Sequence, residues 1–435
     1  MLKKSLLAVA LASILTGCGG SSDGTDSGST DTGSTTYTVI DGYLSAAEVY
    51  VLSPDGGTEI LIGETDANGK IQIEAKYKGY TVIAKIIAGK TTDSDSAGFV
   101  AKSYEMRSTV DSTVVTPFTT LANISVMTLT ALAAELQLDE ADVSGDYVKS
   151  TDGKAHLVAR GLAKKLDDDN DDDDAPGLRA YAGESVSYID TNFTENDDLK
   201  EVELNDDNSS HHARIANIVD FIEDGKTFYG TSFSQYYSSI EGIMEISLVD
   251  GKGTSTYNDT NKTDDTFNYT IDNNKVMIDG VSDEYIYVSK ELVLSVTADN
   301  DLFVYSKADL NSTTGFTADE IQGKTWYVMN DTNTAGTQAI EIFTASLTLH
   351  ATNQTLTAAY DEEVQNGTYT LINGTLALTI ENDAGPSDYL EFRKGAGNED
   401  MIIAMEVNSA TTPIIFSTEK NFVSTLAGKW AMLSK

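Results

Sequence analysis

Gly225-Lys226-Thr227-Phe228-Tyr229 returns 98 residues later as Gly323-Lys324-Thr325-Trp326-Tyr327. A second stretch repeats in the same way, because Phe267-x-Tyr269-Thr270-Ile271 is matched by Gly367-x-Tyr369-Thr370-Leu371. Similarity at a fixed spacing marks tandem copies of one structural unit. We therefore predict that residues 225–310 and 316–435 hold two copies of one domain.

Each copy divides into about eight short runs with strand character. In the first copy these runs are 226–233, 241–249, 253–258, 266–272, 275–280, 284–289, 292–298 and 302–308. Eight antiparallel strands can close into a small barrel, which removes the exposed edges of an open sheet. The Gly-Lys-Thr-Trp-Tyr opening and Gly428-Lys429-Trp430 resemble the Gly-x-Trp start of lipocalin-like barrels, although an extra Thr precedes the aromatic residue in both copies. We expect two tandem eight-stranded barrels, with Trp430 returning to pair with or plug the second.

Short alternating runs also fill residues 37–115, at Tyr37–Ile40, Glu48–Leu52, Glu59–Ile62, Ile71–Glu74 and Thr81–Ile87. Asn68-Gly69 is a strong hairpin signal, since a type I′ turn needs positive φ at both positions. The pattern predicts a small antiparallel β-sandwich. The stretch Gly63–Lys70 resembles the turn of the carboxypeptidase-regulatory and Cna-B-like sandwich domains of bacterial surface proteins.

The period changes at Thr116-Pro117, which predicts the start of a helix because Thr is a good N-cap and Pro suits the first helical position. Apolar residues then follow at helical spacing near Leu121, again over 157–162, and over 215–222. We expect residues 116–224 to be mainly helical, with an Asp-rich linker. The order of these features over residues 37–166 resembles uncharacterised surface lipoproteins of marine proteobacteria, a resemblance that implies no known activity.

The chain begins with Lys3, Lys4 and an apolar run to Leu15, and then reads Leu15-Thr16-Gly17-Cys18. This run is shorter than the roughly 20 apolar residues that span a bilayer, and its layout is that of a secretory signal. Leu15–Cys18 resembles the lipobox of bacterial lipoproteins. The resemblance implies removal of residues 1–17, lipid attachment to Cys18, and, with Gly19 next, an outer-membrane location on the periplasmic or extracellular face. Residues 18–36 have no apolar residue after Cys18 and are expected to form a flexible tether.

Charge and cysteine content narrow the function classes. The formal net charge is −39, which disfavours nucleic acid as a partner. Cys18 is the only cysteine, so the sequence offers neither a disulfide framework nor thiolate-bound zinc.

Acidic runs raise the question of calcium. Asp167, Asp169, Asp171 and Asp173 are candidate ligands, but the EF-hand pattern fails because Asp172 stands where Gly is required. A solvated linker is therefore favoured over a structural calcium site. Asp93, Asp95 and Gly98 form a shorter fragment of the same kind, interpreted as a turn.

The histidines give no catalytic pattern. His211 and His212 are expected at a helix N-terminus, and His350 at a surface position on a strand. Gly-Lys-Thr at 225 and 323 is not a P-loop, since Asp220 and Ala318 replace the required upstream Gly. We expect no enzyme and no cofactor other than that possible calcium. The predicted function is a membrane-attached, non-enzymatic binding or adhesion module for an extracellular or envelope ligand. The alternative is carriage of a small apolar ligand inside a barrel.

Overall fold

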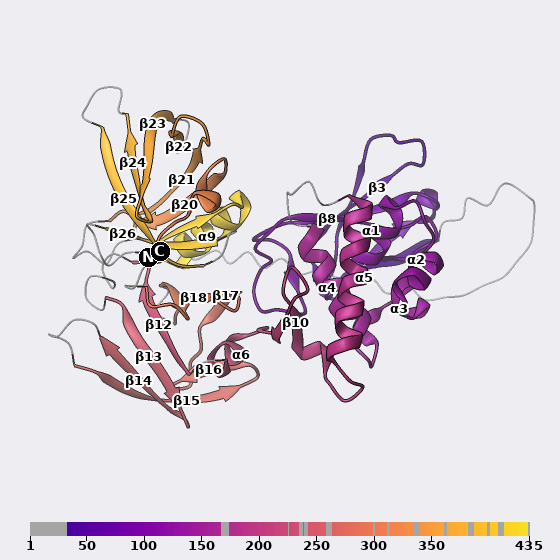
Figure 1. Ribbon diagram of the computed structural model, residues 1–435, viewed down its shortest axis with the longest axis horizontal. Coiled ribbons are helices and arrows are strands. Elements are labelled where there is room, and N and C mark those ends of the chain that lie inside the picture. The colour runs from indigo at the N-terminus through magenta and orange to yellow at the C-terminus, as the bar shows by residue number, and fades with distance from the viewer. Residues whose placement is uncertain are drawn as a thin grey trace, which may run out of the picture.

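The structure is a computed structural model that describes residues 33–166, 174–224, 226–234, 238, 242–257, 263–298, 301–310, 314–333, 340–360, 363–381, 387–397, 401–407 and 413–433. The expected signal peptide, Cys18 and the acidic residues Asp167, Asp169, Asp171 and Asp173 lie outside these ranges. The molecule is mainly β, as expected. Figure 1 shows an N-terminal region of short strands and helices beside two β-units, coloured pink to orange and orange to yellow.

Two small sheets share one core in the N-terminal region. The first has the order β5 (Lys70–Glu74), β1 (Ser34–Val39), β9 (Val114–Val115), and the second has the order β4 (Ile60–Glu64), β3 (Glu48–Leu52), β6 (Thr81–Ile86), β8 (Tyr104–Arg107). Val49 and Val51 on β3 enter the core with Val82 and Ala84 on β6, which is the two-residue period of a strand. β1 and β9 pair in parallel, so the arrangement is not wholly antiparallel. The sandwich assignment of residues 37–115 stays a prediction.

The turn at Asn68-Gly69 is present, but it does not form the expected hairpin. β4 pairs with β3 while β5 pairs with β1, so the strands on either side of the turn belong to different sheets. The Asp66 carboxylate accepts main-chain hydrogen bonds from Asn68 at 2.8 Å and Lys70 at 2.9 Å. Of the two turn residues only Gly69 has a positive φ, of 69°. The type I′ prediction is wrong because an Asp side chain closes this turn as the chain crosses between sheets.

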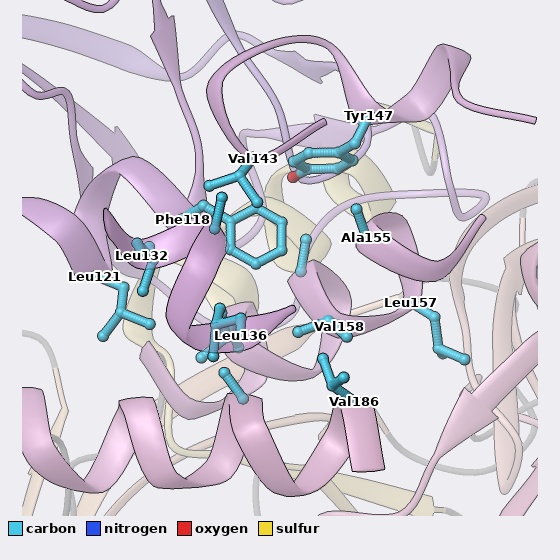
Figure 2. Packing of buried hydrophobic residues seen from close by; sticks show 14 of the residues in the cluster. Phe118, Leu121, Leu132, Leu136, Val143, Tyr147, Ala155, Leu157, Val158 and Val186 are labelled. Atoms are coloured by element: carbon cyan, nitrogen blue, oxygen red, sulfur yellow. The ribbon is translucent and has the colours of Figure 1, made fainter. Parts of the chain in front are cut away.

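Helices pack around a second core, shown in Figure 2. They are α1 (Pro117–Ile124), α2 (Leu129–Leu136), α3 (Glu140–Ser144), α4 (Lys154–Leu166) and α5 (Ala175–Asn192). Thr116 caps α1 in a reciprocal capping box with Thr119, which confirms the predicted helix start. The helical spacing of apolar residues continues to Leu136, but these residues form two helices instead of one. α1 and α2 are bent relative to each other by 105° at Ser125–Thr128.

The first β-unit is an eight-stranded sheet that curves as a half-barrel. Its strands are β12 (Thr227–Ser232), β13 (Met244–Val249), β14 (Lys252–Tyr257), β15 (Asp265–Asp272), β16 (Lys275–Ile278), β17 (Glu284–Val288), β18 (Leu292–Val296) and β19 (Leu302–Ser306). Their order is β16-β15-β14-β13-β12-β19-β18-β17, so β16 and β17 are the edges. The strand ranges agree closely with the sequence prediction.

The second β-unit is a closed barrel with strands in sequence order. They are β20 (Thr325–Asp331), β21 (Ile342–Leu349), β22 (Thr355–Tyr360), β23 (Glu363–Ile372), β24 (Thr375–Ile380), β25 (Asp388–Gly397), β26 (Met401–Glu406) and β27 (Pro413–Ser417). Trp326, Tyr369, Phe392 and Phe416 are buried in its interior core.

The prediction of two closed barrels therefore holds only for the second unit. There β24 pairs with β25 from Thr375 to Ile380, whereas the equivalent strands β16 and β17 of the first unit do not pair with each other in the described part. β16 covers only Lys275–Ile278, and helix α6 (Ile218–Glu223) contacts both edges. Phe221 and Ile222 of α6 belong to the interior core of this unit. The seam is thus covered by apolar side chains of a helix instead of by strand pairing.

A C-terminal helix, α9 (Lys420–Leu433), joins the two β-units. Phe422, Val423, Leu426 and Trp430 occupy one face at helical spacing and enter a core with residues of both units. The Trp430 ring lies 6.4 Å from the Phe233 ring of the first unit, and α9 also contacts β20, β21 and β27 of the second. Trp430 therefore packs between the units and lies in a helix, whereas we had expected it to pair with or plug the second barrel.

Candidate functional site

A cleft of about 860 Å³ opens where the N-terminal region meets the first β-unit. Its walls come from the loop after β7 (Thr92–Asp93), from α4, from the segment around β10 (Val202–Leu204) and β11 (His211–Ala213), and from the turn between β17 and β18. Both basic and acidic side chains line it. The basic ones are Lys102, Arg160, Lys164, Lys165, Arg214 and Lys290, and the acidic ones are Asp41, Asp93, Asp95, Glu203, Asp206, Asp207 and Glu291.

The floor of the cleft carries three carboxyl groups from two adjacent loops. Asp41 follows β1, and Asp93 and Asp95 lie at and after β7. The two loops are tied together because the Tyr43 amide donates to Ser94 Oγ at 2.8 Å and the Ser94 amide donates to the Tyr43 carbonyl at 3.2 Å. Asp95 N donates to Asp93 Oδ1 at 2.9 Å, which confirms the predicted turn.

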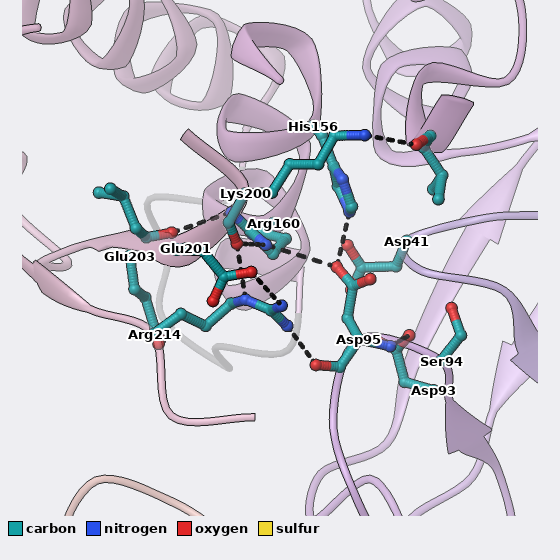
Figure 3. Close-up of polar contacts among 12 residues, drawn as sticks. Asp41, Asp93, Ser94, Asp95, His156, Arg160, Lys200, Glu201, Glu203 and Arg214 are labelled. Atoms are coloured by element: carbon teal, nitrogen blue, oxygen red, sulfur yellow. Dashed lines mark hydrogen bonds and ion pairs between the residues drawn. The ribbon is translucent and has the colours of Figure 1, made fainter. Parts of the chain in front are cut away.

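Asp95 is held by two side chains from helix α4. His156 Nε2 lies 2.6 Å from Asp95 Oδ2, and Arg160 Nη1 lies 3.6 Å from the same oxygen. Figure 3 shows both side chains directed at the Asp95 carboxylate, with the carboxyl group of Asp41 drawn next to it. Of the three carboxyl groups, Asp95 is therefore the one that His156 and Arg160 pair with.

Arg160 and Arg214 also bind the main chain of the cleft wall. Arg160 Nη2 donates to the carbonyls of Leu199 at 3.1 Å and Val202 at 2.9 Å. Arg214 Nε donates to the Lys200 carbonyl at 2.8 Å, and Arg214 Nη1 donates to the carbonyl of Asp95. These bonds fix the segment before β10 against the Asp95 loop (Figure 3).

Of the three carboxyl groups, Asp41 is the one whose negative charge the surrounding groups offset least. Its side chain is buried, Oδ2 accepts from the Tyr104 hydroxyl at 3.1 Å, and Oδ1 has no hydrogen-bond donor among the described residues. Burial, and then the charges of Asp93 and Asp95, raise the pKa of Asp41 well above its ordinary value of 3.8. Burial and the charge of Asp95 raise the pKa of Asp93 to about 7.

The pKa of Asp95 shifts in the opposite direction. Burial opposes its ionisation, but the hydrogen bond from His156 and the charges of His156, Arg160 and Arg214 outweigh burial and lower the pKa of Asp95. The floor therefore combines one stable carboxylate with two carboxyl groups that favour the protonated form. In the part of the chain that the structure describes, no three His, Cys, Asp or Glu side chains are placed to hold one metal ion.

The sequence pointed to few of these residues. His211 and His212 lie on β11 and not at a helix N-terminus, because β11 pairs with β10. The His211 ring packs 4.5 Å from the Phe193 ring, and His212 Nε2 lies 3.8 Å from a Glu203 oxygen at the cleft wall. His350 is exposed, as expected. Asp41, His156, Arg160 and Arg214 were not recognised, and only the Asp93-Ser94-Asp95 turn gave a local signal.

No single described helix is both long and apolar enough to span a membrane, and α1 and α2 reach that composition only as a bent pair. Comparison with known proteins adds no assignment, because no family model matches the chain and no curated protein matches it significantly.

Proposed function

We propose that this protein is a lipid-anchored protein of the bacterial outer membrane that binds an envelope or extracellular ligand without chemically changing it. The proposed anchor is the lipid on Cys18, supported by the Leu15–Cys18 lipobox resemblance. Several acyl chains would give stable attachment. The proposed tether, residues 18–36, would set the folded part off from the membrane on its periplasmic or extracellular face.

One observation supports the choice of binding site, namely the large polar cleft beside the first β-unit. Arg and Lys side chains donate hydrogen bonds, Asp and Glu accept them, and Asn205 does both. Tyr104 and Tyr287 add aromatic side chains to the lining. Such a mixed set suits a hydroxyl-rich ligand, and we propose a polysaccharide segment as the ligand class.

The placement of His156 supports a structural role for this residue. Its side chain is 4% exposed, its Nε2 is bonded to Asp95, and its ring lies 5.5 Å from the buried Tyr147 ring. A general base has to reach the proton that it removes, directly or through one water molecule. His156 therefore supports the shape of the cleft floor, and a non-enzymatic function is proposed.

The alternative of apolar-ligand carriage receives no support from the closed barrel. Trp326 and Tyr369 are fully buried and occupy its interior together with Leu356, Leu376 and Phe416. A carrier needs an open interior volume, and these side chains fill the centre of the barrel. Binding in the cleft is therefore the function that the geometry favours.

The test uses the full chain carrying Cys18→Ser, so that it can be purified without lipid. It is applied to a panel of surface polysaccharides and to intact bacterial cells. Lys290 is exposed at the rim of the cleft, and Lys290→Glu should weaken any binding that the parent shows. Lys275→Glu makes the same charge change at an exposed position on β16 outside the cleft and should leave binding unchanged. Absence of binding across the panel, or equal binding by both variants, would contradict the proposal.

A further inference from the structure

We propose that the carboxyl groups of Asp41, Asp93 and Asp95 share a bound proton that holds the joint between the N-terminal region and the first β-unit together. The joint is defined here as residues 93–101 and 286–291 with their contacts. Loss of this proton as the pH rises is proposed to loosen the joint. The protein would then respond to external pH through the geometry of its cleft.

The first argument is the hydrogen-bond geometry of Asp41. An ionised Asp41 would leave Oδ1 buried with no donor among the described residues, and an unpaired buried charge is costly. A protonated Asp41 carries no charge, so this cost is removed, and in Figure 3 its carboxyl group is drawn next to Asp95. Protonation of Asp41 also removes one of three neighbouring negative charges.

The second argument is the charge around Asp41. Asp93 and Asp95 face it from the β7 loop, Tyr104 from β8, His156 and Arg160 from α4, and Tyr147 from the segment that precedes α4. Tyr104 donates to Asp41, but the Tyr147 hydroxyl donates to the Ile40 carbonyl at 2.9 Å. The nearby nitrogen donors are committed elsewhere, since His156 binds Asp95 and Arg160 binds Asp95 and the main chain. No cation in the described cluster bonds directly to Asp41.

The third argument links the cluster to the joint. Two residues beyond Asp95, the Ala97 amide donates to the Ala216 carbonyl at 2.7 Å, and the Phe99 amide donates to the Ile286 carbonyl at 2.9 Å. Gly98 has φ of +92°, and a Cβ there would lie 2.2 Å from the Ile286 oxygen. The contact is main chain against main chain and tolerates little movement. Repulsion among three ionised carboxylates would act directly on the segment that makes it.

The direction of the pH effect follows from the two raised pKa values. Folding raises the pKa of Asp41 and Asp93 above 3.8, so the folded form holds protons that the unfolded chain releases. The corresponding stabilisation is complete below that ordinary value and is lost as the pH rises through the folded-state values, about 7 for Asp93. Asp95, whose pKa is lowered, contributes stability that is lost only on acidification, below its ordinary value of 3.8.

The experiment measures hydrogen–deuterium exchange of the full chain carrying Cys18→Ser between pH 5.5 and 9, corrected for intrinsic exchange rates. Protection at 97–99 should fall by up to about tenfold per pH unit from pH 5.5 until the pH has passed the folded-state pKa values, and then level off, because one proton is coupled to the contact. β26, inside the closed barrel sheet, serves as the internal reference. Asp41→Asn keeps the shape without the charge and should reduce the fall, whereas the exposed Asp272→Asn should retain it in full.

Three results would overturn the proposal. They are pH-independent protection at 97–99 in the parent, an equal fall in Asp41→Asn, and restoration of protection at pH 9 by millimolar Ca²⁺, which would identify a metal ion as the occupant. If Asp41→Asn does not fold, Asp93→Asn is measured in its place. A reduced fall in that variant supports the proposal, and an unchanged fall contradicts it.

Discussion

Replacing Trp430 by Ala should loosen the packing between the two β-units. The indole is fully buried and packs against Phe233 of the first unit in a core shared with the second. Truncation of a buried Trp to Ala costs about 3–5 kcal/mol, because contacts are lost and a cavity is left. Trp430 Nε1 has no hydrogen-bond partner among the described residues. Trp430→Phe therefore keeps most of the ring contact, removes an unpaired N–H, and should cost less than about 1.5 kcal/mol.

Guanidinium unfolding followed by fluorescence measures this difference. The chain has 2 tryptophans, and the other, Trp326, is buried inside the closed barrel and reports on that unit in the Trp430→Ala variant. With an m-value of about 5 kcal/mol/M, a loss of about 4 kcal/mol lowers the midpoint by about 0.8 M. For Trp430→Phe the shift should be about 0.3 M or less. Equal midpoints for the Ala and Phe variants would refute the reasoning that Trp430 joins the units.

Three further changes test other parts of the account. Cys18→Ser should move the full chain from the membrane to the soluble fraction and abolish labelling with palmitate, and unchanged membrane fractionation would remove the anchor from the proposal. Gly98→Ala should destabilise the folded form by about 1–3 kcal/mol, since strained φ values carry a cost of that size and the new Cβ would lie 2.2 Å from the Ile286 oxygen. Gly183→Ala, whose Cβ would have no neighbour within 4 Å, is its control in thermal unfolding, and equal midpoints would contradict the close contact. Phe221→Ala should cost about 3–5 kcal/mol and expose apolar surface to a fluorescent dye, because this fully buried ring lies in the helix that covers the β16–β17 seam. Parental stability with no added dye binding would show that α6 does not cover the seam.

The strands of the β-units could be predicted because local patterns specify them. The eight runs of the first unit match β12–β19 within a few residues, and their alternation reflects one face packed in a core. Closure was not predictable from the same patterns. It depends on whether β16 meets β17 or α6 lies between them, and that choice is made by Phe221 and Ile222, outside both strands.

Two helices were missed for different physical reasons. α5 starts directly after the Asp run, and Asp174 caps it by accepting a hydrogen bond from Gly177 N at 2.8 Å. The last Asp of the predicted linker is therefore the N-cap residue of a helix. α9 contains Gly428-Lys429-Trp430, whose likeness to the two repeats predicts that Trp430 pairs with or plugs the second barrel. The helical spacing of Phe422, Leu426 and Trp430 outweighs that short motif.

Most residues of the candidate site could not be predicted from the sequence because they are far apart along the chain. Asp41, Asp95, His156 and Arg214 come from four separate segments, and each is an unremarkable polar residue in its own context. Their convergence depends on packing α4 against the two sheets and on docking the first β-unit. Only Asp93-Ser94-Asp95 carried a local signal, and it predicted the turn without its neighbours.

The cleft as the ligand site is tested most directly by mapping where a polysaccharide selected from the binding panel protects main-chain amides of the full chain. The account predicts slower exchange at residues 93–102, 203–214 and 287–291 when the polysaccharide is present, with little change in β20–β27. Protection confined to the closed barrel, or binding with no protection in those three segments, would contradict it.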